Sequence, residues 1–191
     1  METNMLVIPG LSDEDIGTLL NVRSYDYYVS MRESIQNNTC QFCKIDHVIN
    51  KVLYENASWM IFHSAFPQKH QDLHLVIPHK KHLLHIKQLD AQDWIDFDEI
   101  CVWANNHFDL PGGAIVMRFG DPRRNASSLR HLHGNIQIPN GRGRVQAVFA
   151  KSPEDIAKKH LVLQVFEKMF LGTPFNKLSA EDQELVKDKL K

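Results

Sequence analysis

Hydrophobic and polar residues alternate along residues 130–138, which read Arg-His-Leu-His-Gly-Asn-Ile-Gln-Ile. An alternation of period two is typical of a β-strand with one buried and one polar face. The apolar face would carry Leu132, Ile136 and Ile138. The other face would carry two imidazoles and two amides, those of His131, His133, Asn135 and Gln137. Gly134 leaves the core face locally empty, which predicts that another backbone comes close there. This polar row is suited to an anion or a metal, although a merely solvated sheet face would show the same alternation.

Further apolar runs predict the other strands of a sheet, at residues 52–54, 59–62, 73–77, 114–119 and 145–149. Helix-capping residues followed by acidic residues predict helices that begin near Ser12, Asp90, Ser152 and Ser179. The apolar spacing extends the first of these helical regions to about residue 35, the second to about 108 and the third to about 170. The chain is therefore expected to be an α+β protein with helices before and after its sheet.

Composition narrows the class of protein. The chain has 191 residues, a formal net charge of -1 and three cysteines. A near-neutral charge predicts no general attraction to nucleic acid or membranes. Three cysteines do not make a disulfide framework, so we expect a reducing, cytoplasmic setting. The short apolar run before Pro9 predicts neither a signal peptide nor a membrane span.

The motif Cys40-Gln41-Phe42-Cys43 has the spacing of half a zinc site or of a thiol redox pair. A polar loop precedes it, whereas thioredoxin-like chemistry would need a strand there, so the sequence favours a metal. Two further ligands are needed, and the chain offers His79, His82 and His131. Cys101 falls in the apolar stripe of the helix after Asp90 and is expected to be a core thiol.

A polar loop at residues 120–128 leads into the histidine strand. It carries guanidinium, amide and hydroxyl groups that suit phosphate oxygens, on Arg123, Arg124, Asn125, Ser127 and Ser128. A loop of this composition is also compatible with simple solvation.

Four motifs in this order resemble those of the histidine-triad (HIT) superfamily of nucleotide hydrolases and transferases. They are Cys40-Gln41-Phe42-Cys43, residues 75–82 (Leu-Val-Ile-Pro-His-Lys-Lys-His), Ser127-Ser128 and residues 131–135 (His-Leu-His-Gly-Asn). The resemblance covers about residues 40–150. It implies a HIT-like domain there, with an antiparallel sheet of about five strands and a packed helix, and a homodimer. Residues 1–39 and 151–191 would then be helical extensions.

The resemblance also implies a mechanism. His133 would attack the α-phosphorus of a nucleotide and form a nucleotidyl-histidine, which is passed to water or to another acceptor. A neutral imidazole is both a nucleophile and a leaving group near pH 7. Its other ring nitrogen should donate to a fixed acceptor such as a backbone carbonyl. Ser128 and Asn135 would donate to the phosphoryl oxygens. Substrate contacts would come from Ser64, Arg123, Arg124, Asn125, Ser127 and Gln137.

In zinc-bearing relatives the C-x-x-C motif pairs with the first histidine of the triad and with one upstream histidine. In this chain the resemblance implies a structural zinc site formed by Cys40, Cys43, His82 and His131, with His79 as the rival of His82. Such a metal would brace the nucleophile strand.

Two positions depart from the family pattern. Asn135 stands where the third histidine is usual, and the transferase branch also carries an amide, glutamine, at that position. Ser64 stands where an acidic residue usually holds the ribose hydroxyls. The resemblance as a whole implies a nucleotide hydrolase. A nucleotidyltransferase or phosphorylase, and a nucleotide-binding module without catalysis, remain as alternatives.

Overall fold

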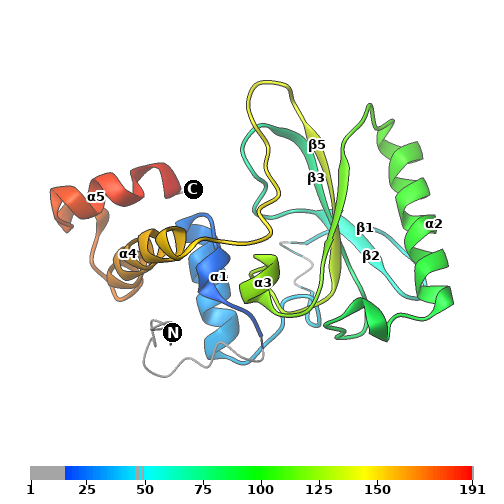
Figure 1. The fold of residues 1–191 in the computed structure, drawn as a ribbon, viewed down its shortest axis with the longest axis horizontal. Helices are drawn as coiled ribbons and strands as arrows, with labels where there is room; N and C mark the ends of the chain where they lie inside the picture. The colour runs from blue at the N-terminus through cyan, green and yellow to red at the C-terminus, as the bar shows by residue number, and fades with distance from the viewer. Residues whose placement is uncertain (1–15, 46–47, 49, 191) are drawn as a thin grey trace.

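Five strands form one antiparallel sheet in the order β1-β2-β3-β5-β4 (Figure 1). The computed structural model describes residues 16–45, 48 and 50–190. The strands are β1 Val52–Glu55, β2 Met60–His63, β3 Gln71–Pro78, β4 Ala114–Arg118 and β5 His133–Pro139. The predicted α+β class is confirmed, and the predicted histidine strand is the central partner of β3 and β4.

The helices follow their capping residues. The α-helices are α1 Tyr25–Gln36, α2 Ala91–Phe108, α3 Pro122–Asn125, α4 Pro153–Phe170 and α5 Ala180–Val186. Short 3-10 helices cover Leu19–Asn21, Ile86–Gln88, Phe175–Lys177 and Lys187–Lys189. The predicted caps Asp90, Ser152 and Ser179 each accept a hydrogen bond from the first turn. The predicted start at Ser12 lies outside the described residues, and α1 is capped by Ser24.

Two hydrophobic cores hold the molecule together. One lies between the sheet and α2, where Trp59, Ile77, Ile100 and Ile136 are buried. The other joins α1 to α4 and α5 and buries Tyr28, Met31 and Phe166. The N- and C-terminal helices therefore pack on each other, on the side of the sheet away from α2 (Figure 1).

Strand pairing fixes which residues share a face of the sheet. His133 lies opposite Arg118 on β4, and Asn135 lies opposite Val76 on β3. Side chains two residues apart on a strand point to the same face. His133, Asn135 and Gln137 therefore share the face away from α2, as the alternation predicted.

Gly134 points the other way, toward α2. A Cβ atom on Gly134 would lie 2.9 Å from ring atoms of Phe97. The prediction that another backbone approaches there is wrong, because an aromatic side chain of α2 fills the space instead.

The predicted strand at residues 145–149 is also wrong. Residues 143–152 form no helix or strand, and Val148 and Phe149 are 45% and 55% exposed. The carbonyl of Val148 accepts from the Arg118 guanidinium rather than from a neighbouring strand. Apolar and polar residues alternate in this segment, but its apolar side chains are not buried. The loop at residues 120–128, predicted to be irregular, contains the short helix α3.

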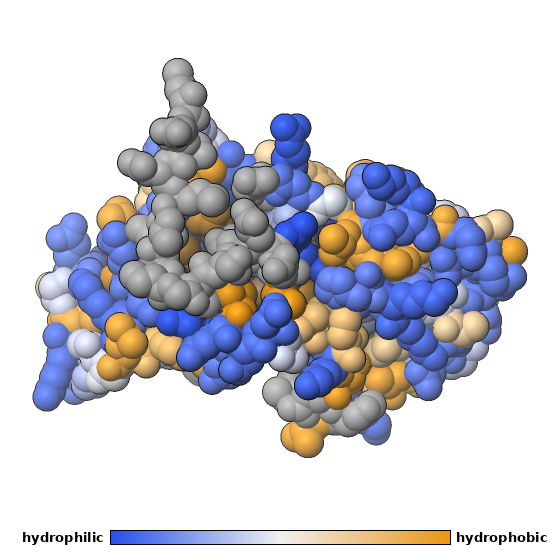
Figure 2. Space-filling view, turned by 90° about the horizontal axis from the view of Figure 1, so that it is seen from below, coloured by the Kyte–Doolittle hydropathy of each residue, from blue (hydrophilic) through white to orange (hydrophobic). Residues whose placement is uncertain are grey.

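Apolar patches on the face seen from below lie between hydrophilic side chains (Figure 2). None of the described helices combines the length and apolar character needed to cross a membrane.

Candidate active site and metal centre

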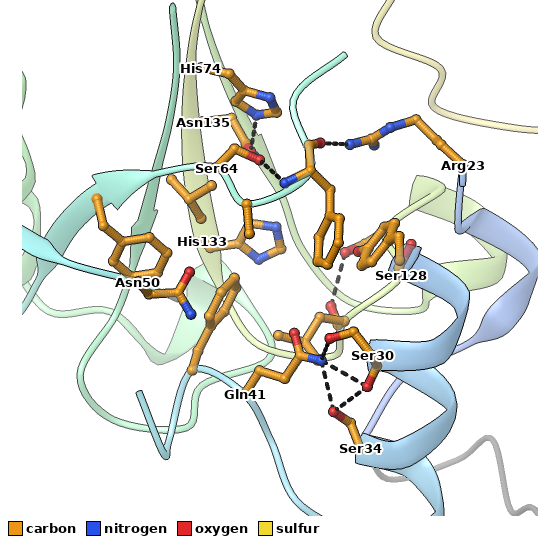
Figure 3. Close-up of a pocket in the computed structure, with 18 of the residues that line it drawn as sticks. Arg23, Ser30, Ser34, Gln41, Asn50, Ser64, His74, Ser128, His133 and Asn135 are labelled. Carbon is orange, nitrogen blue, oxygen red and sulfur yellow. Dashed lines mark hydrogen bonds between the residues drawn. The ribbon is translucent and has the colours of Figure 1, made fainter. Parts of the chain in front are cut away.

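A cavity of about 370 Å³ lies against the polar face of the sheet, within the range of about 300–1,000 Å³ typical of small-molecule sites. Strands β2, β3, β4 and β5 contribute to it, and α1 forms another wall (Figure 3). Six of the predicted catalytic and substrate-binding residues line it: Ser64, Ser127, Ser128, His133, Asn135 and Gln137.

His133 is held in one orientation by its own backbone neighbourhood. Its Nδ1 lies 2.6 Å from the carbonyl oxygen of His131. A carbonyl can only accept, so Nδ1 carries the proton and Nε2 keeps its lone pair. Burial lowers the pKa of His133 to about 4, against the raising effect of this hydrogen bond. The imidazole at pH 7 is therefore neutral, with an unprotonated nitrogen in a half-buried position that lines the cavity.

Phe42 packs against this imidazole from the C-x-x-C loop. Its ring centroid lies 5.1 Å from that of His133 and 5.5 Å from that of His131, both in edge-on geometry. The loop is tied to α1, because the Gln41 amide donates to Ser30 and Ser34 (Figure 3). The cysteine motif thus contributes to the placement of the His133 ring.

The serine loop is anchored by the segment before α1. Backbone hydrogen bonds join Thr18 to Ser128 and Arg130 to Ile16. Gly17 lies between these bonds, and a Cβ atom there would come within 2.2 Å of the Ser128 carbonyl oxygen. The Ser127 hydroxyl donates to the Leu129 carbonyl at 2.9 Å, whereas no hydrogen bond of the Ser128 hydroxyl occurs among the described residues. Ser128 therefore has a hydroxyl available to a ligand.

Asn135 is buried beside His74 of β3. His74 Nε2 lies 3.0 Å from Asn135 Oδ1, so the imidazole donates and the amide oxygen accepts. His74 Nδ1 is buried and has no partner in the described part of the chain. The Asn135 amide nitrogen makes only a long contact of 3.4 Å with the Val116 carbonyl. The second N–H of this amide has no partner among the described residues and is available to the cavity.

Two predicted substrate contacts are not brought into this cavity. Arg124 is exposed on α3 and does not line it. The Asn125 amide donates to the Phe119 carbonyl and accepts from the Ser127 backbone N–H, so it stabilises the loop. The side chain of Arg123 lies outside what the structure describes.

Sequence reasoning missed four basic residues that line the cavity: Arg23, Lys44, His74 and Arg118. Arg23 precedes α1 and donates to the Phe66 carbonyl at 2.5 Å. The rings of Tyr27 and Phe66 stack at 4.6 Å beside it. A signal was present for two of them, since His74 interrupts an apolar strand and Arg118 ends one.

Four side chains converge next to His133 to form a candidate metal site. The ligand atoms of Cys40, Cys43, His82 and His131 all lie within 4.8 Å of one another. Two thiolates and two imidazoles are a donor set of tetrahedral structural zinc sites, in which the bonds are about 2.0–2.3 Å long. Cys40 Sγ lies 3.3 Å from His131 Nδ1, and Cys43 Sγ lies 3.1 Å from His82 Nδ1. The residues present therefore fit zinc in number and chemistry.

Hydrogen bonds to residues outside the cluster also orient one of its histidines. His131 Nε2 donates to the His79 carbonyl at 2.6 Å, which leaves Nδ1 as the ligand atom. The His79 imidazole is itself engaged with Asp93 Oδ1 at 3.1 Å and is not a member of the cluster. Of the two histidines left open by the sequence, His82 is the one placed with the cysteines.

Several solved structures are similar to this chain. A HIT family hydrolase from Clostridium thermocellum is 19% identical, with 57% of this chain and 96% of that chain covered and a TM-score of 0.47. A Zn-bound histidine triad protein from Mycobacterium smegmatis is 16% identical, with 71% and 99% covered and a TM-score of 0.42. The Plasmodium falciparum diadenosine triphosphate hydrolase is 19% identical, with 62% and 78% covered and a TM-score of 0.39.

No protein-family model and no curated protein sequence matches the chain. The chain resembles histidine-triad proteins in its motifs, and the similar solved structures carry that family name. At these identities and TM-scores, the chemistry has to be argued from the residues of the cavity itself.

Proposed function

We propose that this protein is a nucleotide hydrolase that acts at the α-phosphate through a nucleotidyl-His133 intermediate. One observation carries the proposal. The His131 carbonyl fixes the proton of His133 on Nδ1, 2.6 Å away, so that Nε2 is an unprotonated nucleophile in a cavity that Ser128 and Asn135 also line.

The reaction divides into two displacements. The Nε2 lone pair forms a bond to the α-phosphorus while the bond to the leaving group breaks, and the leaving group departs with that electron pair. Water then forms a new P–O bond and loses a proton, and the P–N bond breaks with its electrons returning to Nε2. Each displacement has a lower barrier than direct attack of water on the conjugate.

Ser128 and Asn135 would supply hydrogen-bond donors to the phosphoryl oxygens. Donors fixed before the reaction stabilise the charge that moves onto these oxygens in the transition state. Asn135 is preorganised for this task because its oxygen already accepts from His74. Ser64 and Gln137 would contact the nucleoside part of the substrate from the same cavity.

We further propose that Cys40, Cys43, His82 and His131 hold a structural zinc ion. The four donors would close its coordination sphere, so no site for water or substrate would remain on the metal. Through Phe42 and the His131 carbonyl, these residues would hold the His133 ring in place. The homodimer expected from the resemblance stays a prediction, which light scattering in solution would test.

A transferase is the second candidate, and Asn135 favours it. An amide donates hydrogen bonds without changing its protonation, so it would stabilise the intermediate without helping water to attack. The alternative that is not an enzyme is a nucleotide-binding module without catalysis.

Turnover of a panel of nucleoside 5′-phosphate conjugates, with and without added phosphate or sugar phosphate, distinguishes these functions. His133-dependent release of nucleoside monophosphate supports the hydrolase, and acceptor-dependent products support the transferase. If nucleotides bind to the wild-type protein and to His133→Ala alike and neither turns them over, the enzyme proposal fails.

A further inference from the structure

We infer that Arg23 and Arg118 form a second anion subsite beside His133, which takes a phosphate group on the leaving-group side of the substrate. The inference rests on the proposed function and narrows it. The substrates would be nucleotides joined through a phosphoanhydride, such as nucleoside diphosphate conjugates, rather than phosphoramidates.

The two arginines come from distant parts of the chain to the same place. Arg118 lies directly opposite His133 in the β4–β5 pairing, and Cβ atoms of such pairs are about 4.5–5.5 Å apart. Arg23 reaches in from the residue before the α1 cap, as Figure 3 shows. Both line the cavity of His133, and both also line an adjoining hollow of about 700 Å³. They therefore stand beside His133, where its cavity and the adjoining hollow share lining residues.

The guanidinium of Arg118 is incompletely satisfied. Its Nε is buried without a hydrogen-bond partner among the described residues. Its Nη2 donates to the Val148 carbonyl at 3.3 Å, and its Cζ lies 5.6 Å from the centre of the Phe149 ring. A guanidinium held over an aromatic ring with a free buried donor is prepared for an anionic acceptor.

No carboxylate neutralises either arginine within the described part of the chain. Arg23 donates to a backbone carbonyl, and the described ion pairs do not include Arg23 or Arg118. Glu33 lines the cavity of His133, but so does Lys44, and no described ion pair joins Glu33 to either arginine. Asp26 and Asp188 line the outer hollow, but so do Lys69 and Arg144. Burial lowers the pKa of Arg118, and the charge of Arg23 lowers it further. Like charges gathered without a counter-charge favour binding of an anion between them.

The choice of leaving group follows from Asn135. A departing amine must be protonated as its bond to phosphorus breaks, and an amide side chain has no proton to transfer. A departing phosphate accepts the electron pair of the broken P–O bond and leaves as a stable anion without a proton. The extra negative charge would then be stabilised by the two guanidinium groups. Asn135 thus provides no proton for a leaving amine, whereas Arg23 and Arg118 provide two positive charges for a leaving phosphate.

Binding of inorganic pyrophosphate, a probe that has no nucleobase, tests the subsite apart from catalysis. Calorimetric titration would compare the wild type with Arg23→Gln, Arg118→Gln and Arg118→Lys. Arg142→Gln is the matched control, because Arg142 is exposed and lines neither cavity. We expect each glutamine variant to weaken pyrophosphate at least tenfold, Arg118→Lys to weaken it less, and the control to match the wild type.

Kinetics test the substrate class. Each substrate would be supplied with each of the four common bases. The ratio of kcat/KM for a nucleoside 5′-diphosphate to kcat/KM for the matching 5′-phosphoromorpholidate should fall at least tenfold in Arg23→Gln. Because Arg23 is exposed, this variant should fold even if Arg118→Gln does not.

An unchanged ratio with His133-dependent turnover of both substrates would overturn the inference and leave the proposed function intact. The inference also fails if kcat/KM falls by the same factor for both substrates, because the arginines would then act on the phosphate that both substrates share. If nothing is turned over, the proposed function fails, and the pyrophosphate titration alone decides whether the subsite exists.

Discussion

The imidazole of His74 and the amide of Asn135, on neighbouring strands, are joined by a hydrogen bond of 3.0 Å within the sheet. This bond occupies the amide oxygen of Asn135. The amide nitrogen is left with a single contact of 3.4 Å to the Val116 carbonyl. A histidine in β3 thus fixes the orientation of Asn135, the residue that the resemblance places at the third triad position. His74 is a positioning residue, because it acts through Asn135.

Replacement of His74 by phenylalanine tests this role. His74→Phe keeps a ring of similar size but removes the donor, so we expect kcat to fall about tenfold, which corresponds to about 1.4 kcal/mol. His74→Gln, which retains an N–H donor, should recover part of the loss. His107→Phe, on the exposed part of α2, is the control. Additive effects of His74→Phe and Asn135→Ala in a double-mutant cycle would show that the two residues act separately.

The metal site predicts one zinc ion per chain in protein purified without chelators. Cys40→Ser should lose the metal and lower the unfolding temperature, since a closed metal site contributes to folding. Cys101→Ser should retain the metal, because Cys101 lies outside the cluster. Elemental analysis and thermal unfolding measure the two quantities. Freely titrating Cys40 and Cys43 thiols in a metal-free, equally stable protein would count against the site.

The Glu167 carboxylate connects α4 to α1 and gives a pH-dependent stability. It forms an ion pair of 3.1 Å with Arg32 and accepts from the Tyr28 hydroxyl. Burial raises the pKa of Glu167, but the bonds from Arg32 and Tyr28 outweigh it, and the net shift is downward. A lowered pKa stabilises the fold above the pKa of the unfolded state, near 4.5, and this stabilisation is lost as the pH falls through the folded-state value.

We therefore expect Glu167→Gln to lower the free energy of unfolding by about 1–3 kcal/mol at pH 7, by removing a charged partner from a partly buried network. The difference from the wild type should shrink below pH 4.5. Urea unfolding at several pH values measures it. Glu154→Gln, which breaks an exposed pair with Lys158, is the control. A loss of the same size at pH 3 and pH 7 would contradict the assignment.

The contact of Gly134 with Phe97 predicts a steric effect on stability. An added methyl group would lie 2.9 Å from the Phe97 ring, so Gly134→Ala should destabilise the fold by about 1–3 kcal/mol through overpacking. Phe97→Leu should reduce that cost by making room. Thermal unfolding of both single variants and the double variant measures the coupling. No coupling would mean that the β5 backbone shifts rather than the ring.

Local rules in the sequence account for much of the fold. Capping by Asp90, Ser152 and Ser179 located three helices because these bonds involve residues only three apart. Alternation located β5 and its two faces. The same signal failed at residues 145–149, because alternation describes a pattern and says nothing about whether a partner strand or a buried face exists.

The site was only partly predictable for a related reason. His133, Ser128 and the residues of the candidate metal site lie in short motifs that can be read along the chain. Arg23 and Arg118 are 95 positions apart in the sequence, and only the packing of α1 and the register of β4 bring them to one cavity. Asn125 was predicted to contact substrate from its polar character, yet its amide is used by the backbone of its own loop.

The most direct measurement is of the covalent intermediate itself. A nucleoside diphosphate conjugate would be mixed with excess protein and quenched with base and denaturant within a turnover, followed by intact-mass analysis and peptide mapping. The account predicts one nucleotidyl group per chain, attached to His133 through an acid-labile bond and absent from His133→Ala. Turnover without any adduct, or an adduct on another residue, would contradict it.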